Sequence, residues 1–142
     1  LNDNPSLTTR ELSGRNPVRI LIDFDLKVPE NFNIYNNEAP TLVLNSIKNS
    51  VEGTVQFIKI EKENFIENLM KTLYEQQIQS VLVEGGSYTL QQFIDVGIWD
   101  EAIIIKNENL VLENGTKAPD FHAESYKTEN FRNNTVKFYK NH

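Results

Sequence analysis

The segment 80–97 reads SVLVEGGSYTLQQFIDVG, and it decides the predicted fold. Its first residues run apolar into Glu84, which is typical of a short strand buried on both faces. The residues after the two glycines carry apolar side chains at helical spacing, and Gly97 is a typical helix end. We therefore predict a strand over 80–84 and a helix over 87–97. The inward positions of this helix are Leu90, Phe93 and Ile94.

Apolar patterns on both sides of this segment extend the prediction. We expect strands at 17–23, 41–46, 54–60 and 101–107. We expect an amphipathic helix at 63–78, with Phe65, Ile66, Leu69, Met70, Leu73 and Tyr74 on its apolar face. Because strands and helices alternate between residues 54 and 106, we predict parallel strands joined by right-handed crossovers. Two weaker strands, near 124–131 and 134–140, predict a C-terminal antiparallel hairpin. The fold class is α/β with a mixed sheet.

Length and composition narrow the functional classes. The 142 residues suit one domain, and there is no cysteine for a disulfide or a thiolate metal site. The net charge of −6 and the absence of a basic run argue against a nucleic-acid partner. No apolar run is long enough to cross a membrane, so we expect a soluble cytoplasmic protein.

The stretch EGGSYT, residues 84–89, is the main candidate for chemistry. A helix N-terminus offers free N–H groups and partial positive charge, and Gly85 and Gly86 let a ligand's phosphates come close to the backbone. The hydroxyls of Ser87 and Thr89 either cap the helix or bind phosphate. Glu84 is predicted to face the crevice at the carboxyl end of its strand. A tight turn before a capped helix is the alternative that this pattern leaves open.

A second candidate is DNPSLTTR, residues 3–10. Asp3 and Asn4 before Pro5 form a turn signal, and Arg10 can hold a phosphate with its forked guanidinium. A solvated loop with an exposed arginine explains the same pattern.

No metal site is predicted. Asp23 and Asp25 are separated by one residue and could bind a divalent ion, although a solvated turn explains them better. His122 and His142 lack partners of metal-ligand type.

Four stretches together resemble one enzyme domain over nearly the whole chain. They are DNPSLTTREL, NPVRILIDFDLKVPENFNIY, VLVEGGSYTLQQFIDVGIWDEAIII and NGTKAPDF. Their order is similar to that in the reductase domain of the bifunctional riboflavin-biosynthesis deaminase–reductase, which resembles dihydrofolate reductase in fold. This resemblance implies that NADPH reduces the ribosyl group of 5-amino-6-(5-phosphoribosylamino)uracil to a ribityl chain. It also implies a homodimer, and a parent chain with a fused deaminase domain.

The resemblance assigns roles to individual residues. Asp3 and Glu84 take the catalytic positions, and Asp3 lies near both the nicotinamide and the substrate. Leu7, Arg10 and Glu84 contact the phosphorylated ribosylaminopyrimidine. The cofactor's phosphates bind along residues 86–92. The full cofactor set is Asp3, Gly85, Gly86, Ser87, Tyr88, Thr89 and Leu90.

Some features depart from the family pattern. Phe24 stands where family members often carry a small or polar residue beside the cofactor, and a glycine expected near Leu112 or Glu113 is missing. The chain starts at Leu1, so we expect it to lack the first strand or strands of the domain. A sheet without these strands has unsatisfied edges, and we expect the isolated chain to be inactive or very weak.

Two other functions stay open. One is a dihydrofolate-reductase-like reductase of another substrate, for which Arg10 has less use. The other is a non-catalytic nucleotide-binding module. Lys48 and Lys59, near strand ends, are candidates to read the 2′-phosphate that distinguishes NADPH from NADH.

Overall fold

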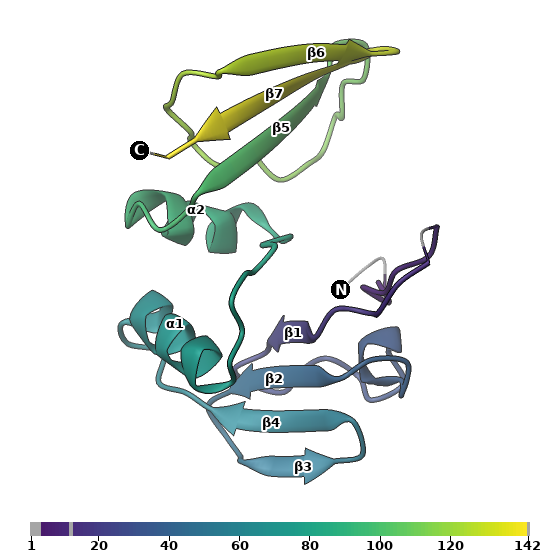
Figure 1. Ribbon diagram of the computed structural model, residues 1–142, viewed down its shortest axis with the longest axis vertical. Coiled ribbons are helices and arrows are strands. Elements are labelled where there is room, and N and C mark those ends of the chain that lie inside the picture. The colour runs from purple at the N-terminus through teal and green to yellow at the C-terminus, as the bar shows by residue number, and fades with distance from the viewer. Residues whose placement is uncertain (1–3, 12, 142) are drawn as a thin grey trace. The chain divides into compact units, whose positions relative to one another are not determined.

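Strand β2 (Thr41–Asn45) is the centre of the first sheet, and all five of its residues are buried. The computed structural model describes residues 4–11 and 13–141, which fall into two compact units, Leu1–Ile78 and Gln79–His142. Figure 1 labels the elements of both. The first sheet has the order β1-β2-β4-β3. Its other strands are β1 (Arg19–Ile22), β3 (Ser50–Glu52) and β4 (Val55–Lys59).

The pairing in this sheet is mixed. β1 and β4 both run parallel to β2, and β3 pairs antiparallel with β4. The short β3 was missed from the sequence, although Gly53 with φ of 62° supplies the hairpin turn between β3 and β4. The strands predicted at 17–23, 41–46 and 54–60 are confirmed.

The core of the first unit centres on Val43, Val55 and Phe57. Helix α1 (Phe65–Glu75) buries five side chains, and the short 3-10 helix η1 spans Asn33–Tyr35. The helix prediction is confirmed, but two positions of its apolar face are wrong. Met70 is 37% exposed and Tyr74 is 83% exposed, while Thr72 is buried instead. The apolar stripe is therefore narrower than the sequence suggested.

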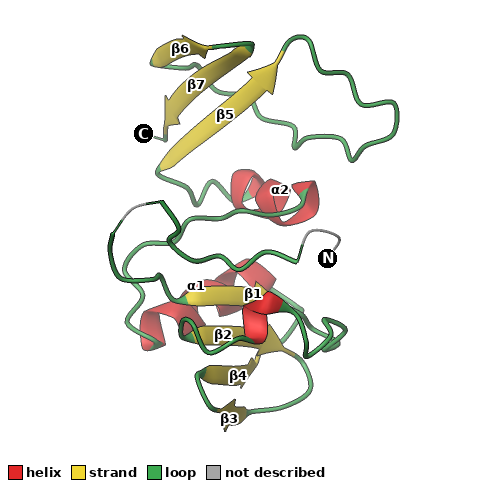
Figure 2. Ribbon diagram, turned by 90° about the vertical axis from the view of Figure 1, so that its right-hand side faces the viewer, coloured by secondary structure: helices red, strands yellow, loops and turns green. Residues whose placement is uncertain are grey.

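The second unit carries a separate antiparallel sheet of order β5-β7-β6, drawn in yellow in Figure 2. Its elements are α2 (Ser87–Asp95), β5 (Glu101–Asn107), β6 (Lys127–Phe131) and β7 (Asn134–Lys140). The C-terminal hairpin is confirmed, with Arg132 at φ of 54° in its turn. Trp99 packs against Phe121, with its ring centroid 5.1 Å from that of Phe121.

The predicted end of α2 is also confirmed. Gly97 has φ of 68°, its N–H donates to the Ile94 carbonyl at 3.0 Å, and the Ile98 N–H donates to the Phe93 carbonyl at 3.1 Å. This pair of bonds is the Schellman arrangement, which favours glycine because the left-handed backbone strains a residue with a Cβ.

Two predictions about the middle of the chain are wrong. Residues 80–84 form an extended connection, not a strand, because no described strand pairs with them, and Val81 and Leu82 are 42% and 82% exposed. The crossover predicted between 54 and 106 therefore does not form. β5 pairs antiparallel with β7, and the parallel pairs lie earlier in the chain. The α/β fold class with a mixed sheet and a C-terminal antiparallel hairpin is nevertheless confirmed.

Candidate functional site

The predicted site residues fall into two groups, one in each unit, and each group is described by itself. In the second unit, Gly86 is the N-cap of α2, with φ of −62° and ψ of 156°. The first bonds of the helix run from the Thr89 and Leu90 N–H groups to the Gly86 carbonyl, at 3.1 and 3.3 Å. The N–H groups of Ser87 and Tyr88 precede these bonds, so they are the amides that an anion can use.

The glycine at position 86 is not explained by its surroundings. Its φ is negative, and a Cβ placed there would meet no described atom within 4 Å. The N-cap of α2 is Gly86, and no side-chain hydrogen bond caps the helix, so the hydroxyls of Ser87 and Thr89 are not helix caps. A bare backbone at a helix N-terminus can accept a phosphate group closely.

The side chains around this turn differ in exposure. Glu84 is exposed, and Tyr88 is 78% exposed, whereas Thr89 and Leu90 are half-buried. Gly85 lies close to Thr89, whose Cβ would be 3.9 Å from a Cβ at position 85. Glu84 is thus available to a ligand, but no described side chain orients it by a hydrogen bond.

One contact that holds helix α2 in place, between Gln91 and Asp120, was not predicted from the sequence. The Gln91 side chain accepts a hydrogen bond from the Asp120 N–H at 2.7 Å and donates one to the Asp120 carbonyl at 3.2 Å. Gln91 also donates to Asp95 at 2.7 Å. Gln91 therefore links the long connection between β5 and β6 to α2. Its side chain has this structural role within the segment 86–92, where the cofactor's phosphates were predicted to bind.

In the first unit, Asp3 lies outside the described residues. Leu7 is half-buried with φ of 49°, and Arg10 is exposed and forms no ion pair with any residue that the structure describes. The segment that carries them lies beside the amino ends of β1 and β2, where Arg19 and Asn33 hold it. Arg10 is therefore a fixed positive charge open to a ligand.

Arg19 is the functional candidate that the sequence reasoning missed. It is 1% exposed in β1, and burial lowers the pKa of its guanidinium, while the nearby Glu38 carboxylate opposes this. Arg19 lies on the same face of the strand PVRILID as Leu21 and Asp23, and this pattern alone does not show that the face is buried. An arginine on the buried face of a strand requires partners at hand.

The two aspartates after β1 serve the turn that follows. Asp23 accepts hydrogen bonds from the N–H groups of Lys27 and Val28, at 3.0 and 2.8 Å. Asp25 pairs with Lys27 and Lys62, each at 2.9 Å, and these lysines lower the pKa of its carboxyl. Within residues 4–11 and 13–141, no three side chains of metal-ligand type gather.

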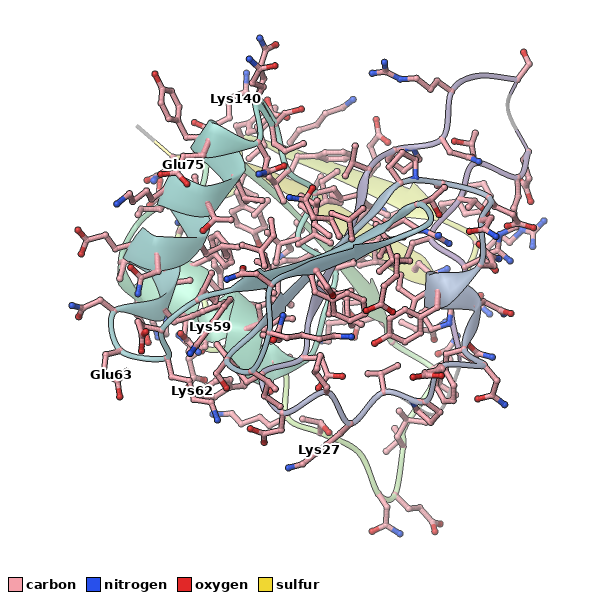
Figure 3. All side chains as sticks on the ribbon, turned by 90° about the horizontal axis from the view of Figure 1, so that it is seen from below. Lys27, Lys59, Lys62, Glu63, Glu75 and Lys140 are labelled. Atoms are coloured by element: carbon pink, nitrogen blue, oxygen red, sulfur yellow. The ribbon has the colours of Figure 1, made fainter. Side chains whose placement is uncertain are left out.

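The remaining candidates are basic or aromatic. Figure 3 shows Lys59 at the end of β4, with Lys62 shortly after it. Lys48 pairs with Glu52 at 2.6 Å and lies 3.9 Å above the Phe57 ring, so it is engaged within its own unit. Phe24 packs edge-on against Phe65 with centroids 5.5 Å apart, which is a packing role.

A hollow of about 510 Å³ in the second unit lies away from the predicted residues. It is lined by Trp99, His122, Ala123, Glu124, Ser125, Tyr126, Lys140 and Asn141.

None of the described helices is long and apolar enough to cross a membrane.

Known proteins are similar to this chain in sequence and in fold. The chain is 34% identical over 111 residues to the riboflavin biosynthesis protein RibD of Aquifex aeolicus, covering 73% of this chain and 31% of that protein. It is 32% identical over 112 residues to the 2,5-diamino-6-ribosylamino-4(3H)-pyrimidinone 5′-phosphate reductase of the same organism, covering 72% of this chain and 50% of that protein. This chain therefore spans at most half the length of these relatives.

A solved structure supports the fold. The diaminohydroxyphosphoribosylaminopyrimidine deaminase/5-amino-6-(5-phosphoribosylamino)uracil reductase of Thermotoga maritima matches with a TM-score of 0.82 at 24% identity. The match covers 98% of this chain and 42% of that one. The profile of the RibD C-terminal domain family matches residues 1–108, about three quarters of the chain. The chain belongs to the family of RibD C-terminal domains.

Proposed function

We propose that this chain carries the reductase function of riboflavin biosynthesis. The reaction is the NADPH-dependent reduction of the ribosyl group of 5-amino-6-(5-phosphoribosylamino)uracil to a ribityl chain. Bound NADPH would supply the hydride, and an acid group or an ordered water would supply the proton that completes the reduction. Membership of the RibD C-terminal domain family and the names of the relatives support this class of reaction. A related substrate is a second candidate, because the reductase of Aquifex aeolicus is named for the diamino pyrimidinone.

The single observation that carries the cofactor assignment is the start of α2. Gly86 is the N-cap of α2, no described atom fills the place of its missing Cβ, and the amides of Ser87 and Tyr88 follow it without bonds inside the helix. Such a helix start favours a phosphate. We assign the cofactor's phosphates to residues 85–90, with the hydroxyls of Ser87 and Thr89 as further donors.

Substrate roles are proposed for three side chains and one backbone. Arg10 holds the ribose or phosphate side of the substrate, the Leu7 backbone contacts the substrate, and the exposed Glu84 carboxylate faces it. Asp3 is assigned a catalytic role that depends on the family resemblance alone. Lys59, which forms no ion pair with a described residue, is the better candidate of the two lysines for the 2′-phosphate of NADPH. We further propose a homodimer in the cytoplasm, and a deaminase domain in the parent chain.

The experiment that tests the proposal is a calorimetric titration of this chain with NADPH, with NADH as the control. Binding that prefers NADPH supports the reductase assignment. Oxidation of NADPH is then followed by absorbance with the uracil and the diamino pyrimidinone substrates, each with and without its 5′-phosphate. Turnover that ignores the phosphate would favour a reductase of another substrate. The same assay is run on an N-terminally extended chain, and binding without turnover by that chain would favour the non-catalytic module.

A further inference from the structure

The segment of residues 4–10 is fastened to the rest of the first unit at three points. The first is Asn4, whose side-chain Oδ1 accepts a hydrogen bond from the Asn33 N–H at 2.7 Å. The Asn33 side chain in turn donates to the Asn4 carbonyl at 3.0 Å. Two hydrogen bonds, both donated by Asn33 and accepted by Asn4, fix both the position and the orientation of the chain at Asn4.

The second point is Ser6, whose carbonyl accepts a hydrogen bond from Arg19 Nη1 at 3.3 Å. The same Nη1 donates to the Asn33 carbonyl at 3.0 Å and to the Asn36 side chain at 2.8 Å. Since Nη1 has two hydrogens for these three acceptors, the Ser6 carbonyl shares one of them. The Arg19 guanidinium thus joins Ser6 to Asn33, the residue that also holds Asn4.

The third point is Thr9, reached through Asn16. The Asn16 side chain accepts a hydrogen bond from the Thr9 N–H at 3.0 Å and donates one to the Glu38 carbonyl at 3.0 Å. All three points therefore lead to one frame, residues 33–38, which itself is fixed by the buried Arg19.

The fastened segment has a backbone that it would not adopt freely. Asn4 and Leu7 have φ of 41° and 49°, in the left-handed region. A leucine is disfavoured there, because its Cβ crowds the following carbonyl oxygen. The fastening points at Ser6 and Thr9 lie on either side of Leu7, so they hold the strained residue in place.

We propose that Arg19, Asn16 and Asn33 are positioning residues for the substrate, which act by holding residues 4–10 in the conformation that presents the Leu7 backbone and the Arg10 guanidinium. This inference rests on the proposed function, because it takes Arg10 as the phosphate ligand. None of the three residues needs to touch the substrate. Each acts through main-chain atoms of the segment, so its loss should weaken phosphate recognition without altering the cofactor's binding.

The test uses Asn16→Ala and Asn33→Ala, with Asn37→Ala as the matched control. Asn37 lies on the same frame, but its side chain accepts its hydrogen bond from Thr54 and forms none with the described residues 4–10. Calorimetry measures the dissociation constants of NADPH, of the phosphorylated substrate and of its dephosphorylated form. Hydrogen exchange of the amides of residues 4–10 reports the order of the segment.

We expect Asn16→Ala to weaken binding of the phosphorylated substrate about tenfold, with faster exchange in residues 4–10. Binding of the dephosphorylated substrate should weaken less, because only the Leu7 contact is affected, and binding of NADPH should not change. Asn37→Ala should behave as wild type. Combined with Arg10→Ala, the Asn16→Ala change should add little further loss, because both act on the same contact.

Two outcomes would overturn the inference separately from the proposed function. If the wild-type chain binds the phosphorylated substrate and Asn16→Ala and Asn33→Ala bind it equally well, the positioning role is wrong while the proposed function stands. Equal loss of NADPH and substrate binding would show general unfolding in place of positioning. If the wild-type chain binds neither substrate nor NADPH, the proposed function fails, and the positioning role fails with it.

Discussion

Arg19 and Thr41 begin neighbouring parallel strands, and Arg19 Nε donates a hydrogen bond to the Thr41 hydroxyl at 2.9 Å. Both residues are 1% exposed. The Thr41 hydroxyl in turn donates a hydrogen bond to the Ile34 carbonyl at 3.1 Å. The threonine thus gives the buried arginine an acceptor where no water can supply one.

Replacement of Thr41 by valine should therefore destabilise the chain strongly. The change keeps the shape but leaves the Arg19 Nε–H without its acceptor, which costs about 1–3 kcal/mol of unfolding free energy. The matched control is Thr54→Val, whose exposed hydroxyl bonds to Asn37 and should matter by less than about 0.5 kcal/mol. Urea unfolding measures both, and equal midpoints for the two variants would contradict the role given to Thr41.

Adjacent residues of α1 should respond very differently to truncation. Leu73 is 1% exposed and Tyr74 is 83% exposed. We expect Leu73→Ala to lower the unfolding free energy by about 3 kcal/mol, because it leaves a cavity. Tyr74→Ala should change it by less than about 0.5 kcal/mol. A larger loss at Tyr74, measured in the same denaturant series, would mean that its ring is covered in solution.

Two glycines should separate stability from binding. Gly97→Ala introduces a Cβ at φ of 68°, where there is room but the backbone is strained, so stability should fall by about 1 kcal/mol. Gly86→Ala meets no clash and no backbone strain, so it should fold as wild type. It should nevertheless weaken NADPH binding by at least about tenfold, because the added methyl group obstructs the phosphates. Thermal unfolding and calorimetry would report the two effects, and unchanged NADPH binding by Gly86→Ala would remove the cofactor assignment at α2.

The chain should lose stability in alkali through Tyr35. Burial raises the pKa of its phenol, and the carboxylates of Asp23 and Glu30 raise it further. The folded state therefore keeps the proton more tightly than the unfolded chain, whose tyrosine pKa is about 10. This contribution is fully present below about pH 10 and is lost as the pH rises through the higher folded value.

The Tyr35→Phe variant tests this, because phenylalanine has no proton to lose. Its unfolding free energy should fall less steeply than that of wild type above about pH 10. The matched control is Tyr74→Phe, at an exposed position, which should follow wild type across the whole range. Parallel curves for all three proteins would show that Tyr35 does not titrate as stated.

Local patterns predicted most elements, because each depends on neighbours in sequence. The apolar run at 41–46 and the helical spacing at 63–78 both gave elements close to their observed bounds. The segment at 80–84 failed because strand formation depends on a pairing partner, which its own residues do not supply. The prediction that Gly97 ends α2 was correct, because the left-handed backbone at a helix end depends on the residue at that position and not on distant partners.

The candidate site was predictable only in part for the same reason. The glycines before α2 and the open charge of Arg10 are visible as residue types at recognisable positions. Arg19, Asn16 and Asn33 were not identified, because their partners lie 7 to 29 residues away in sequence. Contacts at such separations are determined by the fold as a whole.

The acceptors around Arg19 have one more consequence. Its described hydrogen bonds end on carbonyl, amide and hydroxyl oxygens, which carry no net charge and do not titrate. Acid that protonates carboxylates leaves these oxygens unchanged, and dissolved ions screen short buried dipoles far less than surface charges. The frame beneath residues 4–10 should thus keep its shape in acidic and concentrated salt solutions that disrupt the surface ion pairs of the same unit.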